Sequence, residues 1–135
     1  MAKIDHVGIA VRSIAQARRL YDALGLSVLE EGETDQDGVR SVMIPLGESR
    51  LQLLEPLDKR TPVGEFLSQH GEGLHHLALH VDDISGTFEE MKQAGFTLIS
   101  DEIQIGENGR LHFWVDPSAS SGVLLEICQD PISAV

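Results

Sequence analysis

Four polar side chains in otherwise apolar stretches have the types needed to bind a metal ion: His6, Gln52, His76 and Glu126. Two imidazoles, a carboxylate and an amide oxygen suit a divalent ion of hard to intermediate character. Such a set would leave two or more coordination positions open for substrate oxygens. Taken singly, each residue is more often an ordinary strand residue, so the prediction depends on whether the fold brings all four together.

An internal repeat relates these residues to one another. The segment 5–11 resembles 75–81 at an offset of 70, and this offset holds without a gap through the helix that follows. Further along, Leu51–Leu54 matches Leu125–Cys128 at an offset of 74. We therefore expect a single domain made of module one (1–58), a linker (59–71) and module two (72–135).

Each module is expected to contain one helix, which can position the strands that bear the polar residues. Apolar spacing predicts helices over 14–24 and 84–94, and a short helix over 63–70 in the linker. Ser13 and Asp83 are placed to cap the first two helices at their N-termini. The glycines Gly25 and Gly95 are placed to end them.

The remaining segments predict strands with a period of two residues. These strands span 4–11, 27–33, 39–46 and 50–55 in module one, and 75–82, 97–104, 110–116 and 123–128 in module two. Asp37-Gly38 and Asn108-Gly109 provide turn residues. The predicted fold class is α+β, with two tandem β-α-β-β-β modules forming one curved eight-stranded sheet and the helices outside.

Strand alternation places the four polar residues on one face of this sheet. The opposite face is apolar and suits the helices. The four residues occupy two pairs of repeat-related positions, so a pseudo-twofold axis between the modules would bring them together at the centre of the concave face. The sequence therefore predicts a divalent metal site bound by His6, Gln52, His76 and Glu126.

The other histidines and the cysteine fit this site less well. His75 alternates to the opposite face, and His70 falls in the linker. His80 shares the ligand face but lies about 13 Å beyond His76 along an extended strand. His112 is the repeat mate of Ser41, and Cys128 is most simply a small buried apolar residue.

Composition excludes several classes of protein. The chain has 135 residues, a net charge of −12 and 4% aromatic residues, which argues against a nucleic-acid partner. A single cysteine excludes an intramolecular disulfide. No apolar run approaches the ~20 residues of a membrane span. The first residues lack the apolar region of a signal peptide, so we expect a cytoplasmic protein.

The sequence resembles the vicinal oxygen chelate superfamily (glyoxalase I, bleomycin resistance proteins and dioxygenases) and, within it, the methylmalonyl-CoA epimerase family. The segments with this resemblance are 5–11, 52–56, 71–78 and 122–126. The resemblance implies that His6, Gln52, His76 and Glu126 bind a divalent metal, with Co, Ni, Zn, Mn and Mg not distinguished. It also implies an acyl-CoA substrate, a homodimer, and epimerisation at C2 through a metal-stabilised enolate.

Two positions depart from the pattern of that family. Several epimerases have a glutamate acting as a base where this chain has Ser41, so the second acid/base is open. We expect Glu126 to act as both ligand and acid/base, with His112 or a bound water as the second group. At Asp116-Pro117-Ser118 the family often has His-Pro-Lys, whose lysine could hold CoA phosphates, so phosphate recognition is also open.

Two other functions remain open at this point. One is a glyoxalase I-like lyase or isomerase acting on a hemithioacetal, and the other is a binding module that holds a ligand without metal. The four intact candidate ligands argue against the binding module. The segments 71–76 and 52–56 favour the epimerase over the glyoxalase.

Overall fold

The computed structural model describes residues 2–28, 30–34, 38–106 and 109–131, with side chains of 30–34 left undescribed. The chain forms two compact units, each described by itself: the first unit is His6–His75, and the second unit combines Met1–Asp5 with His76–Val135. The expected turn residues Asp37 and Asn108 lie outside the described residues. Within them, no helix is long and apolar enough to cross a membrane.

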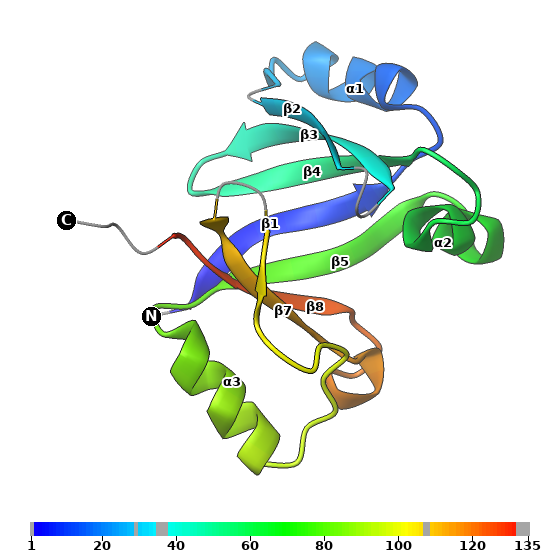
Figure 1. Ribbon diagram of the computed structural model, residues 1–135. Coiled ribbons are helices and arrows are strands. Elements are labelled where there is room, and N and C mark those ends of the chain that lie inside the picture. The colour runs from blue at the N-terminus through cyan, green and yellow to red at the C-terminus, as the bar shows by residue number, and fades with distance from the viewer. Residues whose placement is uncertain (1, 29, 35–37, 107–108, 132–135) are drawn as a thin grey trace. The chain divides into compact units, whose positions relative to one another are not determined.

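The first unit has the strand order β2-β3-β4-β1. Its strands are β1 (Lys3–Ala10, which starts in the second unit), β2 (Glu30–Thr34), β3 (Val39–Leu46) and β4 (Ser49–Pro56). Strands β1 and β4 are parallel, while β3 runs antiparallel to both β2 and β4. The sheet of this unit is therefore mixed (Figure 1).

Helix α1 (Ile14–Ala23) covers one face of the first unit's strands. Ile14 packs there against Val42, Ile44 and Leu53 in a buried apolar cluster. The Ser13 side chain accepts a hydrogen bond from the Gln16 N–H, which confirms the predicted N-cap. The helix is followed by Gly25 at φ 81°, a conformation that costs glycine little.

Helix α2 (Pro62–His70) packs against the opposite face, contrary to the expectation that all helices lie on the apolar side. Its Val63 and Leu67 join Ala10, Val39 and Leu54 in a second buried cluster. Ala10 and Leu54 share a face with the polar positions further back on β1 and β4, but they are apolar. The linker helix therefore covers the apolar end of the face that bears His6 and Gln52.

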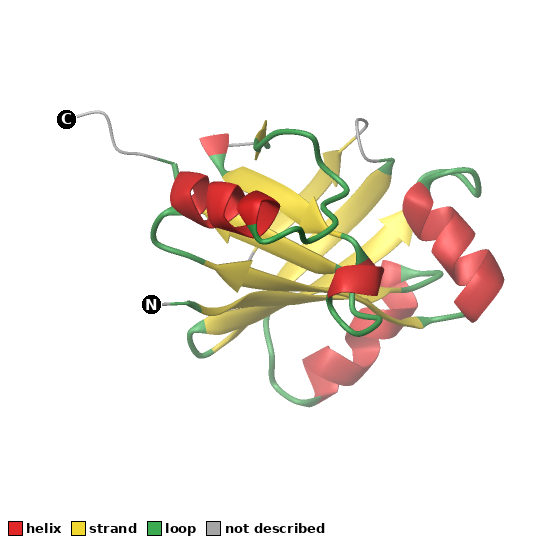
Figure 2. Cartoon of the chain, turned by 90° about the horizontal axis from the view of Figure 1, so that it is seen from below, coloured by secondary structure: helices red, strands yellow, loops and turns green. Residues whose placement is uncertain are grey.

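The second unit has the strand order β5-β8-β7-β6. The bounds are β5 (Gly73–His80, which starts in the first unit), β6 (Gln104–Ile105), β7 (Leu111–Val115) and β8 (Leu125–Gln129). Strands β5 and β8 are parallel, and β7 is antiparallel to β8 and β6. Figure 2 shows the strands of the chain in yellow and its helices in red. The short 3₁₀ helix η2 (Pro117–Ala119) precedes β8.

Helix α3 (Ile84–Gln93) packs on β7 and β8 and closes the apolar face of the second unit. Ile84 and Phe88 contact Phe113, Val115 and Ile127 in its core. Asp83 accepts a hydrogen bond from the Gly86 N–H, as predicted for an N-cap. Helices α1 and α3 thus each bury an apolar stripe against one face of the strands in their own unit.

Side chains near the C-terminal ends of β4 and β8 accept hydrogen bonds from the first turns of α1 and α3. The Glu55 carboxylate accepts a hydrogen bond from the Ile14 N–H at 2.8 Å, and the Gln129 amide oxygen accepts one from the Ile84 N–H at the same distance. Both N–H groups belong to the unsatisfied first turn of a helix. The end of each parallel strand therefore fixes the start of the helix beside it.

The prediction of a strand over 97–104 is largely wrong. Only Gln104–Ile105 forms a strand, and Leu98 makes an isolated bridge with Val115. The Ser100 hydroxyl accepts the Trp114 N–H at 3.2 Å, at a point where a regular ladder would offer a backbone carbonyl. This side-chain substitute interrupts the pairing with β7.

Candidate metal centre

The second unit brings His76 and Glu126 together on neighbouring strands. His76 lies on β5 and Glu126 on β8, with the His76 Nε2 at 3.7 Å from the Glu126 Oε1. Both side chains are largely shielded from solvent, at 4% and 15% exposed respectively. The pairing depends on strand register, since Ala78 is the residue directly beside Glu126. Two predicted ligands are therefore close enough to share an ion.

Trp114 supports this pair from β7. Its backbone is in register with Glu126, so the two side chains share a face of the sheet. The indole meets the His76 ring edge-on, with centroids 5.1 Å apart and planes at 78°. This contact restricts the rotation of the His76 imidazole and keeps water from one side of it.

The first unit places His6 and Gln52 on the adjacent parallel strands β1 and β4. His6 is in register with Arg50, and Gly8 is in register with Gln52. His6 and Gln52 therefore point to the same face, one pleat apart. Gly8 has no side chain, so the residue beside Gln52 on β1 adds no bulk to this face. A ligand role for Gln52 stays a prediction.

His6, His76 and Glu126 form a group that could hold a metal ion. Each offers one ligand atom, and these atoms all lie within 4.8 Å of one another. Both histidines are buried. The donor set of two imidazoles and a carboxylate fits a divalent ion of intermediate hardness.

His112 lies on β7, on the same face as Trp114. It is in register with Cys128, one pleat from the Trp114–Glu126 pair. Its ring lies 6.5 Å from the Trp114 ring, and a Cβ added at Gly106 would sit 3.4 Å from the His112 Cε1. The half-buried imidazole is thus packed from two sides, and its catalytic role stays a prediction. Ser41 is described on β3, in register with Leu54.

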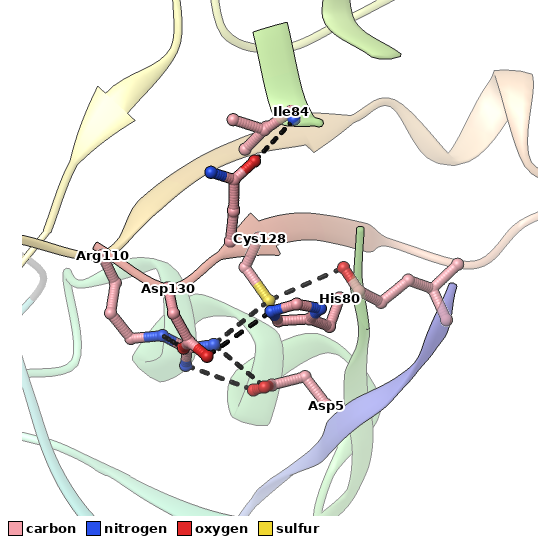
Figure 3. A network of polar contacts seen from close by, with 8 residues as sticks. Asp5, His80, Ile84, Arg110, Cys128 and Asp130 are labelled. Atoms are coloured by element: carbon pink, nitrogen blue, oxygen red, sulfur yellow. Dashed lines mark hydrogen bonds and ion pairs between the residues drawn. The ribbon is translucent and has the colours of Figure 1, made fainter. Parts of the chain in front are cut away.

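His80 and Cys128 belong to a polar network that the sequence did not reveal (Figure 3). His80 Nε2 lies 3.5 Å from Asp130 Oδ2. Arg110 contacts Asp5, Cys128 and Asp130. Burial, and after it the nearby Asp5 carboxylate, raise the pKa of the Cys128 thiol to about 12.

Arg110 and Trp114 could have been found from their alternation with His112. The three residues are two positions apart, so Arg110, which immediately precedes β7, has the same parity as His112 and Trp114 on the ligand face. The remaining histidines, His70 and His75, both contact the Phe66 ring, with centroids 4.9 and 5.1 Å away. The His70 contact lies within α2, whereas the His75 contact packs α2 against β5.

Comparison with known proteins identifies the family. The model of the glyoxalase/bleomycin resistance protein/dioxygenase superfamily matches residues 5–113. The chain belongs to this superfamily. Its mixed sheet and helices are those of the vicinal oxygen chelate fold, as the sequence resemblance predicted.

The relatives of this superfamily member include named enzymes. It is 33% identical to mitochondrial methylmalonyl-CoA epimerase of Mus musculus over 96% of this chain and 74% of that protein. It is 30% identical to ethylmalonyl-CoA/methylmalonyl-CoA epimerase of Cereibacter sphaeroides over 96% of this chain and 98% of that protein. These relatives are isomerases, in agreement with the predicted enzyme class.

Solved structures are also similar to this chain, and they include a methylmalonyl-CoA epimerase. A methylmalonyl-CoA epimerase in complex with methylmalonyl-CoA and NH₄⁺ superposes with a TM-score of 0.90 at 31% identity, covering 96% of this chain and 95% of the other. A hypothetical protein from Bacillus halodurans superposes with a TM-score of 0.92 at 36% identity, covering 99% and 98%. The likeness therefore spans nearly the whole chain.

Proposed function

We propose that this protein is a metal-dependent methylmalonyl-CoA epimerase. The observation behind the proposal is the close approach of His6, His76 and Glu126 in a chain that is similar to epimerases from end to end. The substrate class comes from the names of those relatives. The finer architecture, with tandem modules 1–58 and 72–135 joined by the linker 59–71 in one curved eight-stranded sheet, is part of the proposal, as are a homodimer and a cytoplasmic location.

The proposed ligand set is His6, Gln52, His76 and Glu126. A bound divalent ion would supply Lewis-acid stabilisation of the negative charge that develops on the thioester oxygen when C2 loses its proton. The protein's own part is to hold two buried imidazoles and one carboxylate in place. The Trp114 ring restricts one of those imidazoles, which reduces the reorganisation needed when the ion binds.

Epimerisation needs one acid/base on each face of the planar intermediate. We assign one role to the Glu126 carboxylate and the other to His112. Ser41, where several relatives have a glutamate, is a neutral side chain and cannot accept the proton unaided. His112 is the repeat mate of Ser41 and lies one pleat from Glu126 along the sheet. This position allows the imidazole to approach a substrate bound near Glu126.

The decisive assay follows deuterium at C2. The metal-loaded protein is incubated with methylmalonyl-CoA in deuterated water, and Glu126→Gln is compared with Glu90→Gln, a matched change at an exposed position of α3. We expect exchange in the wild type and E90Q, and loss of both metal binding and exchange in E126Q. His112→Ala should lower turnover while metal binding persists, so unchanged turnover removes His112 from the mechanism.

The same experiment distinguishes the alternatives. No exchange in the metal-loaded wild type, with activity on a glutathione hemithioacetal, would replace the epimerase with a glyoxalase I-like enzyme. A protein that takes up no divalent ion at all would contradict the metal site and favour a binding module.

A further inference from the structure

Arg110 connects segments that are far apart in the sequence. It immediately precedes β7, and its side chain reaches Asp5 at the start of β1 as well as Cys128 and Asp130 at the end of β8 (Figure 3). All of these residues belong to the second unit. The arginine side chain is 25% exposed and the Asp5 side chain 10% exposed. Arg110 therefore acts within the unit and not as a solvated surface charge.

The contact between Arg110 and Asp5 is bidentate. Arg110 Nη1 donates to Asp5 Oδ2 at 3.2 Å, and Nη2 donates to Asp5 Oδ1 at 2.9 Å. A planar guanidinium matched to both oxygens of one carboxylate fixes the orientation of each group, which a lysine ammonium cannot do. The paired geometry therefore holds the backbone at residue 5 in a defined position.

The same guanidinium also reaches β8. Arg110 Nη2 lies 3.6 Å from the Cys128 Sγ, and Nε lies 3.3 Å from Asp130 Oδ1. The thiol in turn lies 3.6 Å from the Leu79 carbonyl oxygen on β5. One cation thus links the start of β1, the end of β8 and, through the thiol, β5.

These contacts lie directly beside the proposed ligands. Asp5 is covalently joined to His6, whose Cα is about 3.8 Å away across a trans peptide. Cys128 follows Glu126 by two residues and shares its face of β8. We propose that Arg110 is a positioning residue that holds His6 and Glu126 in the geometry required for metal binding. This inference rests on the proposed metal site and adds a residue that touches neither metal nor substrate.

Groups that orient metal ligands from outside the coordination sphere typically change affinity by about 10–100-fold when replaced. We therefore expect Arg110→Met to weaken Co²⁺ binding by about that factor. Arg110→Lys keeps the charge but loses the two-pronged fit, so it should weaken binding in the same direction. Arg40→Met is the matched control, because the Arg40 side chain is half exposed and has the parity of Val42 on β3, which packs under α1 on the face opposite Gln52.

Isothermal titration with Co²⁺ measures the affinity, and the visible absorption of bound Co²⁺ reports the ligand geometry. Circular dichroism of each metal-free variant shows whether it is folded. A merely structural role for Arg110 would lower the melting temperature of R110K without altering the Co²⁺ spectrum. We expect an altered spectrum in R110K and an unchanged one in R40M. If R110M is unfolded, R110K decides alone.

Co²⁺ affinity and spectrum in folded R110K equal to those of the wild type would overturn the inference, while the metal site itself would stand. Failure of the wild type to bind Co²⁺ would instead overturn the proposed metal site and the inference together. Asp5→Asn should reproduce the R110K effect, and the double variant should be no worse than either single one. Additive losses in the double variant would also contradict a shared positioning role.

Discussion

Phe113 offers a direct test of how the core supports the ligand face. It is fully buried in the second unit, and its ring meets Phe88 edge-to-face with centroids 5.0 Å apart. It alternates on β7 with His112 and Trp114, which point to the opposite face. Phe113→Ala therefore removes core packing without deleting any residue of the proposed site.

The expected cost follows from burial. Truncating a buried phenylalanine to alanine destabilises a protein by about 3–5 kcal/mol, because transfer and cavity contributions add. We take about 4 kcal/mol, since this ring also loses its aromatic partner. At ~2.1 cal/mol/K per residue, 135 residues give an unfolding entropy of about 0.28 kcal/mol/K. The melting temperature should therefore fall by about 14 °C.

Thermal unfolding of the metal-free protein measures this change, and urea titration gives the free energy independently. Phe96→Ala is the control, because Phe96 is 51% exposed and should cost little. Co²⁺ affinity, measured well below the melting temperature, should be close to that of the wild type. A loss below about 1 kcal/mol, or an equal loss in F96A, would refute the reasoning from burial.

Three further predictions concern single groups. With its pKa raised to about 12, Cys128 should be alkylated by iodoacetamide at pH 8 at least about 100-fold more slowly in the native protein than in urea; native rates within tenfold of the unfolded rate would contradict this. Hydrogen bonds from the Ser118 backbone lower the pKa of Asp116 below its usual 3.8, so this carboxylate stabilises the fold above that pH and loses the effect as pH falls. The melting temperatures of wild type and D116A should therefore differ more at pH 7 than at pH 3, and an equal difference would count against a stabilising role for the hydrogen bond from the Ser118 N–H. Glu55→Ala leaves the Ile14 N–H without its acceptor and should cost about 1 kcal/mol in urea unfolding, whereas E55Q, which keeps an acceptor, should cost less.

Much of the local structure could be predicted because each signal depends on neighbouring residues. Ser13 and Asp83 cap helices that begin where the apolar spacing begins. Strand alternation likewise predicted that His76 and Glu126 share a face. Their separation of 3.7 Å could not be predicted, since it depends on the register of two strands far apart in the sequence.

The failures have a common physical cause, which is competition from partners distant in sequence. The segment 97–104 has an apolar pattern, but the Ser100 hydroxyl takes a backbone N–H of β7 and ends the regular pairing. Helix α2 was expected outside, yet the apolar ends of β1 and β4 on the polar face offered a surface for Val63 and Leu67. The Arg110 network escaped notice because Asp5 and Arg110 are 105 residues apart.

The long-range helix caps also bear on the order of events during synthesis. Helix α1 emerges from the ribosome well before Glu55, which accepts the Ile14 N–H from 41 residues further along the chain. In α3, the Ile84 N–H likewise has its acceptor in Gln129, which is translated 45 residues later. Each helix therefore acquires its complete N-terminus only after the last strand beside it has been translated.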